Sequence, residues 1–463
     1  MILYISILCN ILIGNIIEIP NDFPTIQDGV DYSNNGDTIL VNPGVYNENI
    51  LIDEKELIII SNIGRDSTII DGNSNGPVIT FNNINAENTL LSGFTIQNGT
   101  GAFMTNSNFG GGILCKYSMP KLNDLIIQNN TAFAGGGICY YAIDSTNNTP
   151  IISNSIIKNN LASEGGGIFA INHHLTIENT DIHNNGMDLF GSGGGIQILL
   201  GSLTMNDVNI QYNETRFGGG IYISNSNATL QKININNNYA EAKGGGIWIG
   251  GNTNINFEKA LIYNNQSNNG GGIFTSNSNI NINHTTITDN SVTPNSLGAG
   301  IYMNSGNATI NNSIIYFNYS QNTFNNPNYN LGGYSNDNFS EYDITYSNIQ
   351  GVDNWVPSGV GIISESPLFV NSNNDYNLLL TSPCIDSGDP ALYDLDGTRS
   401  DMGALYYNQQ NIGDVNNDSI INILDIVVLV NLILSNQYDI NGDLNSDNTI
   451  NIQDVVLLVN MIL

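Results

Sequence analysis

Oxygen-bearing side chains recur at a fixed spacing in two stretches near the C-terminus, "DVNNDSIINILD" and "DLNSDNTINIQD". In each stretch they occupy positions 1, 3, 5, 9 and 12, and position 7 offers a backbone carbonyl. In order, the two sets are Asp414, Asn416, Asp418, Ile420, Asn422 and Asp425, then Asp443, Asn445, Asp447, Thr449, Asn451 and Asp454. Hard oxygen ligands at this spacing wrap one calcium ion. The sequence therefore predicts two bound Ca²⁺ ions; the alternative is a pair of acidic turns.

An apolar segment follows each loop, and no helix is predicted before it. These segments, "LDIVVLVNLIL" and "QDVVLLVNMIL", are near-copies and too short to span a bilayer. Part of their surface must pack between the two copies, and the rest should contact another protein. The sequence thus predicts a small α module of two EF-hand-like loop–helix repeats over residues 412–463, after a linker at 408–411.

The tandem loop–helix design resembles a dockerin, the calcium-binding module that joins secreted proteins to cohesin partners. This resemblance implies a cohesin-like partner and implies that loop positions 10 and 11 select it. Those positions hold Ile423, Leu424, Ile452 and Gln453. The sequence departs from the usual pattern at position 6, which holds Ser419 or Asn448, and at position 12, which holds Asp rather than Glu. The alternative role for the module is a stabilising cap on the preceding domain.

A different repeat occupies most of the chain. "GGGI" recurs at intervals of 25 to 30 residues, with its Ile at 113, 138, 168, 196, 221, 247 and 273, and "GAGI" follows at 301. A second pattern, Ile-x-x-Asn, runs in step and places Asn at 130, 160, 185, 213, 238, 265, 290 and 318. Repeats of this length indicate a solenoid. The apolar segments are short and β-branched, which favours strands.

The predicted fold is therefore all-β, a right-handed parallel β-helix over residues 18–407. Asn at each corner is expected to adopt a left-handed conformation and form a ladder, and glycine to allow the tight bend. The region resembles the β-helix superfamily of pectate lyases and polygalacturonases, with repeats similar to those of chlamydial polymorphic outer-membrane proteins. The resemblance implies an amphipathic capping helix near Ile26–Tyr32. It is specific for fold and not for chemistry.

The residues leave open whether the solenoid is an enzyme. Candidates for catalysis are Arg216 and Lys243, which precede successive glycine turns, and Asp181 in an isolated "NTD". The motifs that accompany "NTD" in polygalacturonases are absent, so a solvated coil edge is the alternative for all three. The histidines lack metal-ligand spacing and are expected at the surface. An Asn- and Tyr-rich stretch at 319–360 could offer a sugar-binding surface through Tyr329, Tyr334, Tyr342 and Trp355.

Net charge limits the classes of partner that the protein can bind, and the N-terminal residues bear on its cellular location. The net charge is −31, with 10 Lys and Arg against 41 Asp and Glu, which disfavours nucleic acid and anionic membranes as partners. Residues 1–17 are expected to be a signal peptide, with a buried first strand as the alternative. Cys115, Cys139 and Cys384 are too few for a disulfide framework and are expected to be free and buried.

Two functions remain open from the sequence. The first is a secreted or cell-surface protein that docks to a cohesin-like partner while the solenoid acts as a glycan-binding or surface scaffold. The second is a polysaccharide lyase or glycoside hydrolase with a divergent active site.

Overall fold

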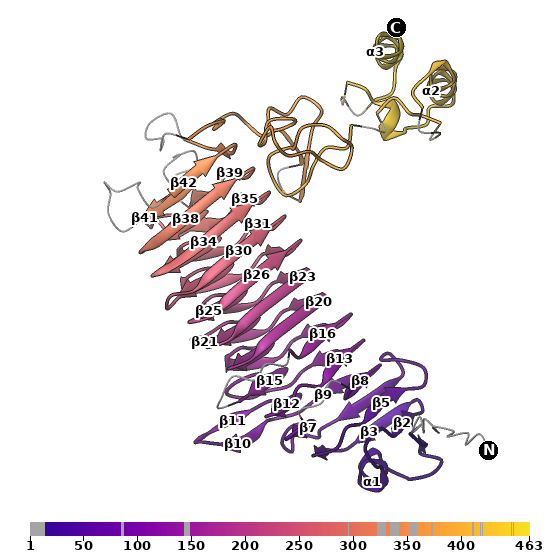
Figure 1. The fold of residues 1–463 in the computed structure, drawn as a ribbon, viewed down its shortest axis with the longest axis vertical. Helices are drawn as coiled ribbons and strands as arrows, with labels where there is room; N and C mark the ends of the chain where they lie inside the picture. Colours follow the sequence, from indigo (N-terminus) through magenta and orange to yellow (C-terminus); the bar gives the residue numbers. More distant parts are fainter. Residues whose placement is uncertain are drawn as a thin grey trace, which may run out of the picture.

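Every glycine-flanked Ile of the repeat begins a strand in the computed structural model of the chain (Figure 1). The structure describes residues 14–84, 88–142, 149–294, 296–321, 330–333, 342–351, 359–371, 374–409, 412–416, 418, 420–445, 447 and 449–463. Residues 14–409 of this set contain a parallel β-solenoid of about ten turns, and a small helical module follows. The β-helix and the α module expected from the sequence are both confirmed.

Three sheets form the walls of the solenoid, and successive coils pair in parallel within each sheet. Sheet A contains β1 (Ile16–Ile19), β2 (Thr38–Val41), β3 (Gly44–Asn47), β5 (Ile58–Ser61), β6 (Thr68–Asp71), β8 (Leu90–Ser92), β9 (Thr95–Gln97), β13 (Lys121–Asn123), β14 (Ile126–Gln128), β16 (Ile151–Ser153), β17 (Ile156–Lys158), β20 (His174–His183), β23 (Ser202–Gln211), β26 (Asn227–Gln231), β27 (Asn234–Asn236), β30 (Asn254–Glu258), β31 (Leu261–Tyr263), β34 (Ser278–Asn283), β35 (Thr286–Thr288), β38 (Gly306–Asn311), β39 (Ile314–Tyr316), β42 (Tyr342–Thr345) and β43 (Asn348–Ile349).

In the central coils, each strand of sheet B begins directly after the glycine run, and each strand of sheet C lies before that run. Sheet B contains β4 (Ile50–Asp53), β7 (Ile79–Asn82), β12 (Ile113–Lys116), β15 (Ile138–Tyr141), β19 (Ile168–Ile171), β22 (Ile196–Leu199), β25 (Ile221–Ser224), β29 (Ile247–Gly250), β33 (Ile273–Ser276), β37 (Ile301–Met303) and β41 (Leu331–Gly333). Sheet C contains β18 (Leu161–Glu164), β21 (Gly186–Ser192), β24 (Glu214–Phe217), β28 (Tyr239–Lys243), β32 (Gln266–Asn269), β36 (Ser291–Val292) and β40 (Tyr319–Ser320).

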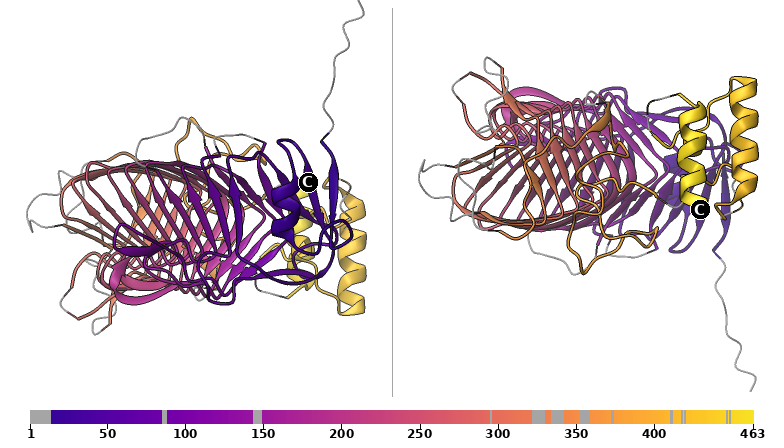
Figure 2. Two further views of the ribbon diagram at one scale, coloured as in Figure 1. Left: turned by 90° about the horizontal axis from the view of Figure 1, so that it is seen from below. Right: turned by 90° about the horizontal axis from the view of Figure 1, so that it is seen from above.

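The remaining elements lie outside these walls. Two antiparallel pairs are β10 (Ala102–Met104) with β11 (Ser107–Phe109), and β44 (Phe369–Asn371) with β45 (Asp375–Leu378). The helices are α1 (Ile26–Tyr32), α2 (Ile423–Ser435) and α3 (Ile452–Ile462), with a 3₁₀ turn at Ile440–Gly442. Helix α1 packs against β1, β2 and β4, as expected for a cap. In both views of Figure 2, α2 and α3 run side by side.

Ile side chains at equivalent positions of the coils stack into the core. The Ile that follows each glycine run is directly paired with its counterpart in the next coil, from Ile113 to Ile301, and each is fully buried. The Ile of the Ile-x-x-Asn pattern is paired in the same way, from Ile127 to Ile315. Burying Ile on both columns supplies the main driving force for coil stacking, at roughly 25 cal/mol per Å² of apolar surface.

The asparagine ladder is present, but its backbone conformation differs from the expectation. From Asn130 to Asn290, each side-chain Nδ2 donates to Oδ1 of the ladder Asn in the next coil, at 2.9–3.1 Å. Asn318 continues the ladder to Asn330. The left-handed residue is the one immediately before each ladder Asn, such as Asn159 (φ 55°) and Asn184 (φ 55°). That residue makes the corner, and the ladder amide can therefore point into the interior.

Glycine is required opposite this ladder. Gly218 begins its turn at φ 66°, a conformation that side chains with a Cβ rarely adopt. A Cβ on Gly220 would lie 2.7 Å from the carbonyl oxygen of Gly246 and 3.2 Å from Nδ2 of Asn238. The glycine run is therefore needed for backbone geometry and for close approach to the amide.

Several expectations about single residues can now be compared with the structure. Cys115, Cys139 and Cys384 are free and buried, as expected. His173 is 1% exposed, so its expected surface position is wrong. Tyr342 lies on β42 with its hydroxyl bonded to the carbonyl of Gly332 (2.9 Å), so it packs in the core rather than forming a sugar-binding surface. Tyr329, Tyr334 and Trp355 lie outside the described residues.

The expected signal peptide, residues 1–17, lies mostly outside the described part of the chain. Residues 1–13 lie outside the described part of the chain. Ile16 and Ile17 belong to β1, which pairs in parallel with β2 and forms part of the first coil. The signal peptide and its boundary at residue 17 stay predictions. No helix of the described residues is both long and apolar enough to cross a membrane.

We predict that replacing Asn213 by Leu lowers the free energy of unfolding by about 2–4 kcal/mol. The Asn213 amide donates to the carbonyl of Ile182 (2.9 Å) and to Oδ1 of Asn238 (3.0 Å), and its oxygen accepts from the Asn185 backbone and side chain. Leucine leaves these buried groups unpaired. Chemical denaturation should show the loss, whereas the same substitution at Asn256, which is exposed on β30, should change stability by less than about 0.5 kcal/mol. Equal effects at both positions would contradict the structural role of the ladder.

His173 should make the solenoid sensitive to acid. Burial lowers the pKa of His173 from 6.5 to about 4. As the pH falls, the unfolded chain therefore takes up this proton at a higher pH than the folded protein does. Its contribution to stability is therefore complete above pH 6.5 and is lost as the pH falls toward 4. Between pH 7.5 and 4.5 the wild type should lose about 2–3 kcal/mol more than His173→Phe, measured by denaturant unfolding at each pH. Parallel pH profiles for the two proteins would refute this assignment.

Candidate functional site

Each predicted calcium loop leads directly into a helix of the C-terminal module. Asn422 and Asn451, at loop position 9, are the N-caps of α2 and α3. Their side-chain oxygens accept from the backbone N–H two residues later, at 2.8 Å in both helices. Asp425 and Asp454, at position 12, complete a capping box by accepting from the N-cap backbone. Residues predicted as calcium ligands therefore also begin the helices.

The carboxylates at positions 1 and 12 hold the loop backbone together. In the first loop, Oδ1 of Asp425 accepts from the Asn416 backbone (3.0 Å), and Oδ1 of Asp414 accepts from the Asp418 backbone (3.1 Å). The second loop repeats both bonds, from Asn445 to Asp454 (3.2 Å) and from Asp447 to Asp443 (3.1 Å). The two loops thus share one hydrogen-bond pattern. Position 6 of each loop, Ser419 or Asn448, lies outside the described residues.

The charge of the module suits a bound cation. Residues 412–463 contain seven Asp and no Lys, Arg or His. Asp414 and Asp443 are 4% exposed, and Asp425 and Asp454 are fully buried. Buried carboxylates are costly unless a positive charge or several hydrogen bonds compensate them, and the module has no cationic side chain for this purpose.

The acidic side chains do not form a complete site by themselves. Among the residues that the structure describes, no group of three or more His, Cys, Asp or Glu is arranged to hold a metal. Calcium would therefore also need the amide oxygens of Asn416 and Asn445 and the backbone carbonyls of Ile420 and Thr449. Those oxygens are the ligand type that calcium prefers, and the donor set fits the ion.

The residues predicted to select a partner lie on the surface. Ile423 is 68% and Ile452 is 69% exposed, and Leu424 is 56% exposed. Gln453 is also exposed, and its side-chain oxygen accepts from Asn445 (3.3 Å). The sequence positions 10 and 11 are thus accessible in both repeats.

The same helix faces expose further apolar residues that were not among the predicted partner-selecting positions. They are Val427, Val430 and Leu434 on α2, and Val456, Leu457 and Met461 on α3. Helical spacing from Ile423 and Ile452 could have identified several of them. The opposite faces pack together through Leu429 and Leu458, both fully buried. The module therefore has a small core and an extended apolar surface.

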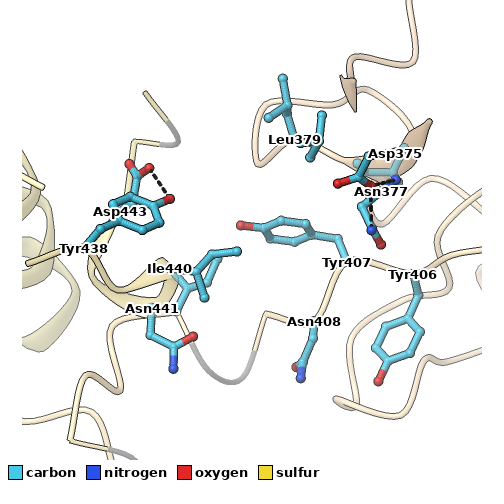
Figure 3. A pocket seen from close by; sticks show the side chains of 13 residues that line it. Asp375, Asn377, Leu379, Tyr406, Tyr407, Asn408, Tyr438, Ile440, Asn441 and Asp443 are labelled. Atoms are coloured by element: carbon cyan, nitrogen blue, oxygen red, sulfur yellow. Dashed lines mark hydrogen bonds between the residues drawn. The ribbon is translucent and has the colours of Figure 1, made fainter. Parts of the chain in front are cut away.

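A cleft of about 370 Å³ separates this module from the last part of the solenoid. Figure 3 shows Tyr407 pointing into it, with Tyr438 and Ile440 of the module on the other side. The Tyr438 hydroxyl donates to Oδ2 of Asp443 (3.0 Å), which is position 1 of the second loop. Burial and this bond raise the pKa of Tyr438 to about 12. No sequence pattern indicated the cleft, because it forms only where the last part of the solenoid meets the module in the folded chain.

The candidates for catalysis lie on two different sheets. Arg216 is on β24 of sheet C, with its guanidinium carbon 5.2 Å from the centre of the Phe217 ring. Lys243 is on the adjacent strand β28, with Nζ 4.7 Å from the centre of the Phe274 ring. Asp181 is exposed on β20 of sheet A. Arg216 and Lys243 are thus on neighbouring coils, as expected, and the structure does not bring Asp181 to them.

Comparisons with known proteins identify the C-terminal module. Residues 412–463 match the family model described as "Dockerin type I domain". The module is therefore a dockerin type I domain, and such domains typically bind calcium and occur in extracellular cellulosome components.

The solenoid has a more distant likeness. A solved structure described as "Crystal structure of pectate lyase Pel9A" aligns at a TM-score of 0.40 and 12% identity, over 83% of this chain and 91% of that chain. No inference about activity follows from a likeness at this level. A search of curated proteins found no match.

We predict that the isolated module, residues 408–463, is loosely helical without calcium and gains helix when calcium is added. The module has few residues to form a core, and its aspartates repel one another without a cation. Circular dichroism during calcium titration, followed by chelation, measures the gain and its reversal. Asp425→Ala and Asp454→Ala should each weaken calcium binding. The larger loss is expected at Asp454, because a loop of this type favours a left-handed backbone at position 6 and Asn adopts it more readily than Ser, so the second loop should bind calcium more tightly. Full helicity in chelator would contradict the coupling.

Proposed function

We propose that this chain is a secreted protein whose dockerin module binds two Ca²⁺ ions and docks to a cohesin-like partner. The predicted organisation is a signal peptide at 1–17, the solenoid at 18–407, a linker at 408–411 and the module at 412–463. The ligands of the first ion are Asp414, Asn416, Asp418, Ile420, Asn422 and Asp425. Those of the second ion are Asp443, Asn445, Asp447, Thr449, Asn451 and Asp454.

The repeated apolar surface of the module carries this proposal. Equivalent residues of α2 and α3 have closely similar exposure: Ile423 and Ile452 at 68% and 69%, Val427 and Val456 at 54% and 55%. Apolar side chains exposed in two equivalent arrays suit burial against a protein. The alternative role, a cap that only stabilises the solenoid, leaves these two arrays without a purpose.

The solenoid is proposed to be a glycan-binding or surface scaffold. Its long outer faces carry mainly uncharged amide and hydroxyl side chains, such as Gln128, Asn209 and Asn234 in sheet A. Such groups exchange hydrogen bonds with sugar hydroxyls. In this arrangement the dockerin module would hold the solenoid, and whatever the solenoid binds, to a larger assembly.

A second candidate function is polysaccharide degradation at the outer face of sheet A. His183 on β20 is paired with Lys158 on β17, and Asp181 lies two residues before it on the same face. Burial and Lys158 lower the pKa of His183, and Asp181 acts against them. A neutral imidazole between an ammonium and a carboxylate can transfer protons. Sugar release from a polysaccharide panel that is lost in Asp181→Asn would favour this site on sheet A, whereas loss in Arg216→Ala or Lys243→Ala would favour degradation at sheet C instead.

Docking should require calcium and at least one of the two apolar arrays. We expect Ile423→Asp and Ile452→Asp each to retain binding to a cohesin panel within about tenfold, because the other array remains. The double variant should lose at least 100-fold in affinity by calorimetry, since an unpaired carboxylate would be buried whichever array contacts the partner. Val45→Asp, at an exposed apolar position on β3, is the matched control and should bind normally. Full binding by the double variant, or by wild type in chelator, would refute the docking proposal.

A further inference from the structure

Cationic side chains are scarce in this chain, and most of them have an evident structural partner. Only 10 Lys and Arg occur, against 41 Asp and Glu. Lys55 donates to the carbonyls of Val30 and Asp31 at the end of α1. Arg65 and Arg399 donate to backbone carbonyls. Two lysines, Lys232 and Lys259, line the same open hollow.

The coil geometry places these two lysines next to each other. Lys232 follows β26 and Lys259 follows β30, at the same corner of consecutive coils. Both have left-handed backbones, with φ of 48° and 54°, and the Lys232 backbone N–H donates to the carbonyl of Glu258 (2.9 Å). The neighbouring coils carry Asp207 and His284 at this corner. One coil spacing, about 4.8 Å, therefore separates the two lysine backbones.

The C-terminal segment of the solenoid forms the other wall of the hollow. It is fastened to sheet A by the Ala404 backbone, which donates to Oγ1 of Thr286 (3.0 Å), and by the contact of His284 Nε2 with Ser400 Oγ (2.7 Å). Beyond these contacts, Leu395 and Tyr406 line, together with the lysines, a hollow of about 530 Å³. This volume is within the usual range for small-molecule sites.

Nearby carboxylates neutralise these lysines only in part. Nζ of Lys232 is 4.0 Å from Asp207, and both side chains are about half exposed, so the pair is weak. The Glu258 carboxylate contacts Asn283 Nδ2 (2.7 Å) and His284 Nδ1 (3.5 Å). Among the described residues, no carboxylate lies within 4.0 Å of Lys259 Nζ, although Glu258 and Asp394 interact with it at longer range.

We propose that this hollow binds an acidic sugar unit, with its carboxylate or sulfate between Lys232 and Lys259. The Tyr406 ring and Leu395 offer apolar surface to the sugar ring, and the Asn234 and Asn377 amides offer hydrogen bonds to hydroxyls. This inference rests on the proposed glycan-binding role of the solenoid and names the surface and the ligand class. It does not depend on docking.

The adjoining cleft gives a longer ligand room to continue. Asn377 and Tyr406 line both the lysine hollow and the cleft that contains Tyr407 (Figure 3). An oligosaccharide with its acidic unit on the lysines can therefore extend along the C-terminal segment toward the dockerin module. We expect affinity to rise from a monosaccharide to a trisaccharide for this reason.

Calorimetry on the full chain at constant calcium tests the proposal. The probes are a trigalacturonate, its methyl ester, a sulfated oligosaccharide of similar length and inorganic sulfate. At least one acidic oligosaccharide should bind tenfold or more tightly than the neutral ester, and its affinity should fall with added salt. Lys232→Met combined with Lys259→Met should weaken this binding at least tenfold. Lys121→Met, at an exposed lysine on β13, is the matched control and should leave it unchanged.

Several results would overturn the proposal. They are equal binding of acid and ester, inorganic sulfate binding as tightly as the acidic oligosaccharides, the same loss in the Lys121 control, or no binding of any probe at millimolar concentration. Cohesin binding measured on the same proteins should be unaffected by the lysine substitutions. Failure of docking and failure of this site can therefore be told apart.

Discussion

The packing of buried asparagine amides against glycine backbone is the constraint on which the solenoid depends. Each ladder amide donates one hydrogen bond to a backbone carbonyl and one to the side-chain oxygen of the next ladder Asn, as Asn213 does to Ile182 and Asn238. Each facing glycine leaves no room for a Cβ, as Gly220 shows beside Asn238. Because both contacts recur in every central coil, they keep the three sheets in the same register from coil to coil. The stacked Ile columns add burial energy to this geometry, but apolar contacts alone would tolerate a slip.

The same register places the lysines of the proposed sugar site. Lys232 and Lys259 face one hollow because they occupy one corner of consecutive coils. Arg216 and Lys243 also lie on consecutive coils, but their charges rest near the rings of Phe217 and Phe274. A repeating scaffold thus converts a spacing of about one repeat in the sequence into direct proximity on the surface. Whether a cationic side chain remains accessible to a ligand depends on the side chains that surround it on its own and neighbouring coils.

Electrostatics divides the protein into two parts with different requirements. Most buried polar groups of the solenoid are neutral amides and hydroxyls, and burial keeps His173 uncharged. The solenoid's buried Asp37 and Asp401 carboxylates accept backbone hydrogen bonds. The dockerin module instead buries Asp425 and Asp454 without any cationic side chain. A bound metal is the available source of positive charge there. Under the proposed calcium binding, folding and partner binding of the module would be linked through the ion.

The repeat spacing by itself determined the β-helix, its coil length, its core columns and its asparagine ladder, whereas the capping helix was implied by the resemblance to other β-helix proteins. The reason is that a coil can only stack on its neighbour when equivalent residues recur. The loop spacing likewise determined the two loop–helix repeats, since the residues of each repeat are local in the chain. Tertiary structure alone decided which residue of each corner is left-handed, that His173 is buried, and that Tyr342 packs in the core. It also decided the lysine hollow, because its walls come from segments more than a hundred residues apart that meet only when the C-terminal segment folds back on sheet A. The adjoining cleft forms where that segment meets the dockerin module.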